Sequence, residues 1–289
     1  MVKQYGMNYY LPTSAENSTK WFYQTSPMIY QYGGKLYNDD GLTTAIDNEE
    51  ALKGLTLLTD LYKYYSLDSQ VKSFYNSFRY GTHPIGTANF SEYLLVKNAA
   101  PEIIGKWEIS SPLGVLKENG IVDRTYISNG SSAMIFKSTS KANESWEFLK
   151  WWTSTSVQIE YSNRLQSTYG PEYTWLSSNI EAVKEAPLDS DDKEVIIESF
   201  NWITDIPRTP GQYMLERGLS NIWTSVALQN EPIGVTIDNE VILINREINR
   251  KMKEFDYLDD ENNIIKPYTV REKDWVYQTI MSNLSGGDK

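Results

Sequence analysis

The chain is dominated by segments whose apolar residues recur at helical spacing, and each segment needs a partner surface to cover its apolar face. The clearest is 239–255, where apolar residues lie on one side of a helix and basic residues lie opposite. Its apolar positions are Val241, Ile244, Ile248, Met252 and Phe255. Similar patterns cover 47–65, 140–161, 180–186, 193–204 and 213–228. A length of 289 residues is sufficient for a core that buries several such helices.

Strand-like stretches are short and are separated by turn residues. They are "YGMNYY", "HPIGTANF", "GKWEISSPLG" and "TYISNGSSAMIF", the last interrupted at Asn129. Asp47, with Glu50 three residues later, is the predicted N-cap of the helix 47–65. Pro101 ends a predicted helix that begins at Ser91. Short strands between longer helices predict a helix-rich α/β fold class.

Composition excludes several classes of function. The formal net charge of −11 argues against binding to nucleic acid or to an anionic membrane. The sequence has no cysteine, which excludes thiol catalysis, disulfides and cysteine-ligated metals. His83 is the single histidine and is expected to be a structural or surface residue. No apolar run of about 18 residues occurs, and residues 1–12 lack the pattern of an export signal.

The stretch 144–161, "ESWEFLKWWTSTSVQIEY", contains three of the nine tryptophans. On a helical wheel, Trp152 falls on the same face as Phe148 and is predicted to be buried in the core. Trp146 lies at the margin of that face, and Trp151 points away from it. Two explanations fit Trp151: a partly exposed ring that covers a neighbouring loop, or a contact with another lobe or chain.

Signals for catalysis and metal binding are weak. Phosphate-binding glycine loops and the G-x-S-x-G motif of serine hydrolases are absent. In "LDSDDKEV" a calcium loop would need glycine at Glu194 and glutamate at Phe200, so that match fails and neither a metal nor a cofactor is expected. Glu92 and Glu216 are a possible carboxylate pair for glycoside hydrolysis. With 38 acidic residues, however, solvated surface charge is the simpler explanation.

Four longer stretches follow one another in a characteristic order. They are "YQYGGKLYNDDGLTTAIDNEEALKGLTLLTDLY", "GTHPIGTANFSEYLLVKNAAPEIIGKWEISSPLG", "SNGSSAMIFKSTSKANESWEFLKWWTSTSVQIEYSNRL" and "IPRTPGQYMLERGLSNIWTSVALQNEP". In this order they resemble the extracellular solute-binding proteins of ABC transporters, in the branch of maltose-binding and other sugar-binding proteins. The resemblance extends from about Tyr5 to Phe255.

The resemblance implies a periplasmic-binding-protein-like (type II) fold, in which two α/β lobes close over a ligand by a hinge motion. The family pattern starts midway, so we expect most of the N-terminal lobe to be missing and the chain to be part of a longer exported lipoprotein. The implied organisation is 1–124, first part of the C-terminal lobe; 125–165, a crossover strand and helix of the N-terminal lobe; and 166–289, the rest of the C-terminal lobe with its tail.

Sugar-binding relatives place aromatic rings against the apolar face of a sugar and polar groups against its hydroxyls, an arrangement with a clear physical basis. The matching positions give the expected ligand-binding residues. They are Trp21 in "STKWFYQ", Asn89, Phe90, Glu92 and Tyr93 after "HPIGTA", Asn129 on the crossing strand, and Arg208 and Tyr213 near "GQYMLERG".

The resemblance implies a binding component of an ABC importer that captures a carbohydrate, in particular an oligosaccharide, and delivers it to the permease subunits. We expect an extracellular lipoprotein or periplasmic protein that is monomeric at full length. With half of the cleft missing, this chain alone should bind sugar weakly or not at all. Two alternatives stay open: a glycoside-processing enzyme, tested by turnover of chromogenic glycosides with Glu92→Gln or Glu216→Gln, and a protein-interaction domain of a larger surface protein, for which an exposed Trp151 is relevant.

Overall fold

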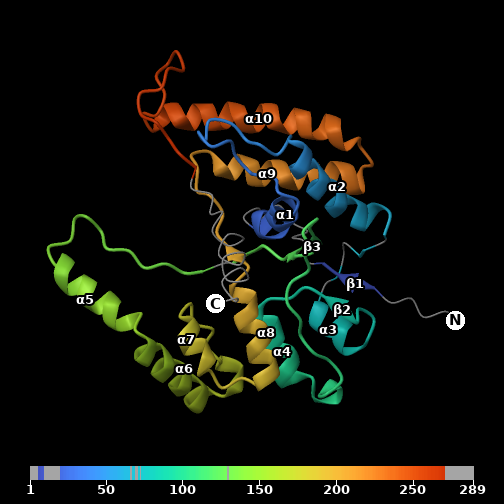
Figure 1. Cartoon of the computed structure of the whole chain (residues 1–289), viewed down its shortest axis with the longest axis vertical. Helices are drawn as coiled ribbons and strands as arrows, with labels where there is room; N and C mark the ends of the chain where they lie inside the picture. The colour runs from blue at the N-terminus through green and yellow to red at the C-terminus, as the bar shows by residue number, and fades with distance from the viewer. Residues whose placement is uncertain are drawn as a thin grey trace.

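The computed structural model describes residues 6–9, 20–65, 67–68, 71, 73–128 and 130–270. Four long helices form its main packed layer, shown above the strands in Figure 1. They are α1 (Lys20–Gln31), α2 (Glu49–Lys63), α9 (Gln212–Trp223) and α10 (Ile233–Glu254). A short π-helical turn, η4 (Thr224–Leu228), extends α9. The apolar faces of these helices meet in the largest core cluster, and this is the core that the sequence pattern required.

The predicted stripe on the last helix is confirmed at its centre. Ile244, Ile248 and Met252 are fully buried against α9 and its neighbours. Phe255 is wrong as a core residue because it follows the last turn of α10 and is 53% exposed. The helix also begins at Ile233, six residues before the predicted start.

The packing of α1 on α2 depends on one glycine. A methyl group on the α-carbon of Gly54 would lie 2.4 Å from the carbonyl oxygen of Met28, so only glycine fits between the two backbones. The N-cap of α2 is Asn48 rather than the predicted Asp47. Its side-chain oxygen accepts a hydrogen bond from the amide of Ala51 at 2.7 Å, which satisfies one of the free amides of the first turn.

The described strands form three two-stranded pairs. β1 (Met7–Asn8) is parallel to β2 (Ile85–Gly86), and β5 (Tyr126–Ile127) is parallel to β6 (Ile203–Thr204). β3 (Val115–Leu116) and β4 (Val122–Asp123) form an antiparallel hairpin that turns at Gly120, where φ is +81°. The strand expected from "GKWEISSPLG" is therefore wrong, because no described residue of 105–114 is in a strand and the pairing occurs in the following segment.

A second group of helices lies below the strands in Figure 1. It comprises α3 (Phe74–Arg79), α4 (Phe90–Ala99), α6 (Thr155–Tyr169), α7 (Ile180–Lys184) and α8 (Ser190–Phe200), with the 3₁₀ turns η2 (Pro101–Ile103) and η3 (Pro171–Tyr173). In the sequence, α3 and α4 come before β5, whereas α5 to α8 lie between β5 and β6, after which the chain continues into α9. The predicted lobe boundaries at 125 and 165 stay predictions, and the second falls inside α6.

The single helix predicted over 140–161 is two helices, α5 (Ala142–Trp152) and α6. The break falls at Thr153 and Ser154, whose hydroxyls bond back to the carbonyl groups of Leu149 and Trp151. Such local bonds compete with continuation of a helix.

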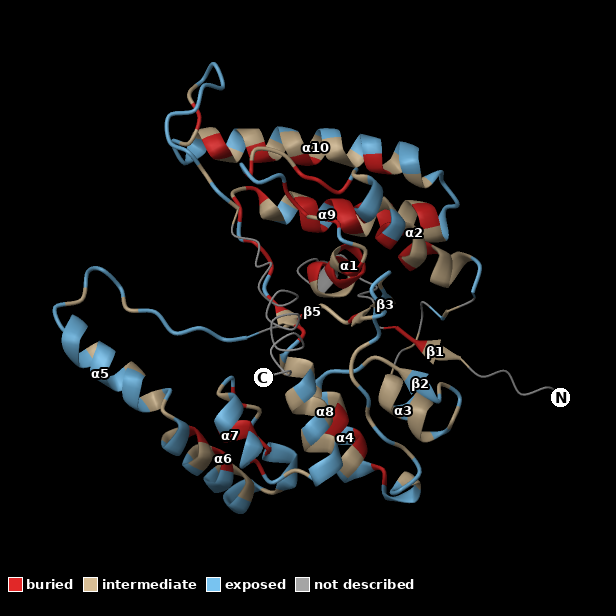
Figure 2. Cartoon of the chain, viewed as in Figure 1, coloured by how far each residue is buried: buried red, intermediate tan, exposed pale blue. Residues whose placement is uncertain are grey.

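The predicted burial of Trp152 in the core is wrong. None of the described residues of α5 is buried, and Figure 2 shows the helix in the colours of exposed and half-buried residues. Trp152 is half-buried and contacts the edge of Tyr161 with ring centroids 5.1 Å apart, while Trp146 and Trp151 are more than half exposed. The outward direction predicted for Trp151 is confirmed. Phe148, on the face predicted to be buried, is also more than half exposed.

Candidate functional site

The loop after β2 places four of the predicted ligand-binding residues together. The amide of Thr87 donates to the carbonyl oxygen of Asn8, which extends the β1–β2 pairing to the start of this loop. Asn89 then caps α4, because its side chain accepts from the amide of Glu92 at 2.9 Å. In α/β folds, ligands bind where the carboxyl ends of parallel strands lead into such helices.

A row of aromatic rings lies at this end of α4. The ring of Phe90 stacks on that of Tyr93 with centroids 5.6 Å apart, and Tyr93 meets the edge of Trp107 at 6.1 Å. Trp107 contacts Phe78 at 6.0 Å, and Phe78 contacts Phe74 at 5.4 Å. We call these five residues the aromatic platform. Tyr93 is buried and the other four rings are half-buried, so part of each of those four stays accessible.

Three members of the platform, Phe74, Phe78 and Trp107, were not among the residues predicted from the sequence. Phe74 and Phe78 have the i, i+4 spacing of one helix face, a signal that was available in the sequence. Trp107 stands in a stretch interpreted as a strand, and its contacts come from α3 and α4. No local sequence pattern predicts a contact between residues of such distant segments.

Polar groups hold the buried end of Tyr93. Its hydroxyl donates to Asp192 on α8 at 2.6 Å and accepts from Lys97 at 2.8 Å. Burial, together with the hydrogen bond to Asp192, raises the pKa of Tyr93 to about 12, so the hydroxyl keeps its proton. Lys97 also binds Asp189 and Asp192, both at 2.7 Å. Burial alone would lower the pKa of Lys97, but these three partners raise it above its usual range.

The paired carboxylates of the enzyme alternative lie on different sides of the fold. Glu92 accepts from the amide of Tyr75 at the start of α3, at 2.9 Å. Glu216 is on α9, and the strands lie between α4 and α9 in Figure 1. Among the described residues, no group of three or more histidine, aspartate or glutamate side chains is arranged to bind a metal ion.

Glu216 is nevertheless an unusual carboxylate. Its side chain is only 5% exposed, and burial raises its pKa to about 7 although the charge of Arg208 acts in the opposite direction. In the unfolded chain the group is expected near a pKa of about 4.3. Between these two values the folded protein binds a proton that the unfolded chain does not.

We expect this proton to make folding dependent on pH. The stabilisation is complete below the unfolded pKa and is lost as pH rises through about 7, the folded pKa. From about pH 5 to pH 8 the free energy of unfolding should fall by roughly 1–2 kcal/mol more in the wild type than in Glu216→Gln. Urea unfolding at a series of pH values measures this difference. The control is Glu194→Gln, an exposed position on α8, and equal pH slopes in Glu216→Gln and wild type would contradict the prediction.

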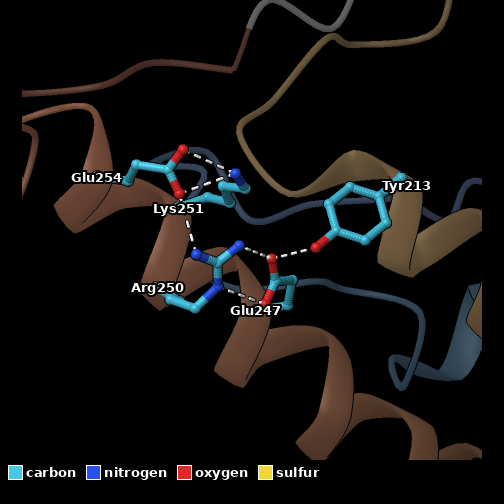
Figure 3. Close-up of polar contacts among 5 residues, drawn as sticks. All are labelled: Tyr213, Glu247, Arg250, Lys251 and Glu254. Carbon is cyan, nitrogen blue, oxygen red and sulfur yellow. Dashed lines mark hydrogen bonds and ion pairs between the residues drawn. The ribbon is translucent and has the colours of Figure 1, made fainter.

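Tyr213 and Arg208 lie at the start of α9, outside the aromatic platform. Tyr213 is half exposed and donates to Glu247 of α10. Figure 3 shows how Glu247 continues into a surface network with Arg250, at 2.7 and 2.9 Å. These contacts, Arg250 first among them, lower the pKa of Glu247 to about 2. Arg208 is exposed, and its carbonyl oxygen accepts from Tyr268 at 2.7 Å.

The two remaining candidates are not placed. Asn129 and the side chain of Trp21 lie outside the described residues. A shallow surface hollow follows one face of α6 and contains none of the predicted ligand-binding residues; it is lined by Ser156, Ile159, Glu160, Asn163, Arg164 and Ser167. The start of α4 thus gathers four of the eight predicted ligand-binding residues, and two of these, Phe90 and Tyr93, belong to the platform.

Comparison with known proteins gives a consistent result. The sequence profile of the family described as bacterial extracellular solute-binding protein matches residues 9–159, which is more than half of the 289 residues. No curated protein sequence matches the chain.

Solved structures share the fold at low sequence identity. The sugar-binding protein MalE from Xanthomonas citri has a TM-score of 0.65 at 14% identity, over 88% of this chain and 60% of that protein. The maltose-binding protein MalE from Listeria monocytogenes, in complex with maltose, has a TM-score of 0.62 at 15% identity, over 81% and 60%. A solute-binding protein from Thermotoga lettingae bound with α-D-tagatose has a TM-score of 0.56 at 21% identity, over 85% and 60%.

The matched region spans about 60% of the length of each of these three proteins. Their fold confirms the predicted class, a helix-rich α/β fold of the periplasmic-binding-protein type II.

Proposed function

Because the chain belongs to the family of bacterial extracellular solute-binding proteins, we propose that it captures a carbohydrate and delivers it to the permease of an ABC importer. The resemblance seen in the sequence is confirmed at the level of the family. The carbohydrate, its delivery and a lipid anchor outside the cell are parts of the proposal. None of the described helices is long and apolar enough to cross a membrane.

The aromatic platform is the observation that carries the proposal. A sugar ring has an apolar face that stacks on aromatic rings, while its hydroxyls need hydrogen-bonding partners. The platform offers four partly accessible rings, with the polar groups of Asn89 and Glu92 at the same helix start. Its rings follow one another at 5.4–6.1 Å, and such a row suits several linked sugar units better than one. We therefore infer an oligosaccharide.

The strands β5 and β6 are the proposed links between two lobes. They lie side by side and parallel, in register from Tyr126 opposite Ile203 to Ile127 opposite Thr204. Two short parallel links permit a hinge motion of the helices α5 to α8 against the rest of the chain. We place the return of the chain at β6, which is later than residue 165. Contacts of a ligand with Arg208 and Tyr213 remain predictions of the sequence.

Removal of the central indole tests the platform. We expect the chain to bind maltohexaose with a Kd of about 0.1–10 mM, since four rings of the platform are half-buried and a ligand on them stays largely hydrated. Trp107→Ala should weaken this binding at least about tenfold because the sugar loses a stacking partner. Isothermal titration calorimetry measures both affinities.

Trp146→Ala is the control, because Trp146 is an exposed ring on α5 outside the platform. Equal affinity of Trp107→Ala and wild type would contradict the role of the platform. A sub-micromolar Kd for the wild type would contradict binding on an open surface.

A further inference from the structure

The buried hydroxyl of Tyr93 connects the aromatic platform to a cluster of charges on α8. Tyr93 and Lys97 occupy successive turns of α4, and both bind Asp192. Lys97 reaches Asp189 as well, at the residue before α8. One lysine is thus shared between two carboxylates and a phenol, and the three partners converge on its ammonium group.

These contacts join segments on different sides of the proposed hinge. The helix α4 precedes β5 in the sequence, whereas α8 lies between β5 and β6. A second polar contact also joins the part of the chain before β5 to α8. The hydroxyl of Ser111 donates to Glu198 near the end of α8. If α5 to α8 move relative to the rest of the chain, both contacts must open.

The cluster is partly shielded from water. The side chains of Lys97 and Asp192 are 27% and 20% exposed, so their attraction is screened less than that of a pair on the open surface. Removing the lysine charge leaves Asp189 and Asp192 close together without a cation between them. Both carboxylates belong to the start of α8, so α8 then loses the positive charge on α4 that attracts them.

We propose that Lys97 and Asp192 are positioning residues of the aromatic platform, which fix the ring of Tyr93 and couple it to the segment between β5 and β6. This inference rests on the proposed function for its link to ligand binding. The coupling works in both directions: a ligand on the platform favours the contact with α8, and the contact favours the ligand. In this proposal Lys97 and Asp192 do not contact the ligand and act only through Tyr93.

The first arm of the test measures the contact without any ligand. The chain has no cysteine, so Ser91→Cys on α4 and Glu194→Cys on α8 provide unique sites for spin labels. Both positions are exposed and outside the cluster. We expect a narrow distance distribution by pulsed electron paramagnetic resonance. Lys97→Met, Asp192→Asn and Tyr93→Phe should each broaden it or shift it to longer distances.

Lys184→Met is the matched control, because Lys184 pairs with Glu181 inside the single helix α7 at 2.7 Å. This substitution also removes one lysine charge but should leave the distances unchanged. Lys97→Arg should preserve the distribution seen in the wild type, since it keeps the positive charge. Unchanged distances in Lys97→Met and Asp192→Asn would overturn the proposal, whether or not the chain binds sugar.

The second arm measures the affinity for maltohexaose by calorimetry. Lys97→Met and Asp192→Asn should each weaken binding about fivefold, while Lys97→Arg and Lys184→Met retain the wild-type affinity. Longer distances with unchanged affinity would overturn the coupling and leave the platform as a binding surface. A wild-type chain that binds no maltohexaose would instead contradict sugar binding by the platform, which carries the proposed function, and the distance arm would then decide the positioning of Tyr93 by itself.

Discussion

Gly54→Ala should lower the free energy of unfolding by about 2–4 kcal/mol. The added methyl group would lie 2.4 Å from the carbonyl oxygen of Met28 and 3.0 Å from the amide nitrogen of Ile29. Both atoms belong to the backbone of α1, so no rotation of a side chain relieves the clash. The helices α1 and α2 must separate, and the core between α1, α2 and α9 loosens with them. Urea unfolding followed by circular dichroism measures the change.

Gly234→Ala is the control for the intrinsic effect of the substitution. Gly234 lies in the first turn of α10, and a methyl group there meets no atom within 4 Å among the described residues. Alanine favours a helix over glycine by up to about 1 kcal/mol, so this variant should be as stable as the wild type or slightly more stable. Equal stabilities of Gly54→Ala and Gly234→Ala would contradict the close packing of α2 on α1 at Gly54.

Ile244→Ala should cost about 3–4 kcal/mol of unfolding free energy. Ile244 is fully buried where α10 packs on α9, and its side chain lies against Gly218. Truncation removes three carbon atoms and leaves a cavity between two rigid helices, which limits relaxation of the surroundings. The same unfolding measurement applies, and a thermal scan should show a matching fall in Tm.

Ile242→Ala separates burial from residue type. Ile242 is on the same helix two residues earlier, and its side chain is 65% exposed. Its replacement by alanine should change the stability by less than about 0.5 kcal/mol. A large loss at this position would mean that α10 is covered on its outer face.

Helices were predictable where the sequence carries a one-sided apolar pattern. The stripe through Ile244 and Ile248 is such a case, because a helix that packs on one side leaves its period in the sequence. The start of α10 was missed because Gly234 and the β-branched Val235 and Thr236 are poor helix formers. The neighbours of α10 in the fold override this local preference.

The candidate site was predictable only in part. Asn89 and Phe90 were expected from the resemblance to sugar-binding proteins, and the apolar pattern up to Pro101 predicted the helix that follows them. Trp107 was missed, since its position beside Phe78 and Tyr93 results from the packing of distant segments. The helical wheel gave the outward direction of Trp151 correctly but could not indicate whether anything covers the opposite face of α5.

The exposed rings of α5 have a consequence for the colloidal behaviour of this chain. Its formal net charge of −11 makes copies repel one another in dilute buffer. At about 1 M salt the screening length falls to about 3 Å, and this long-range repulsion disappears. Trp146, Phe148 and Trp151 are each more than half exposed and then provide short-range attraction between copies. We therefore expect the solubility of the chain to fall as salt is raised, because screening removes the acidic repulsion that opposes contact between the aromatic helices of different copies.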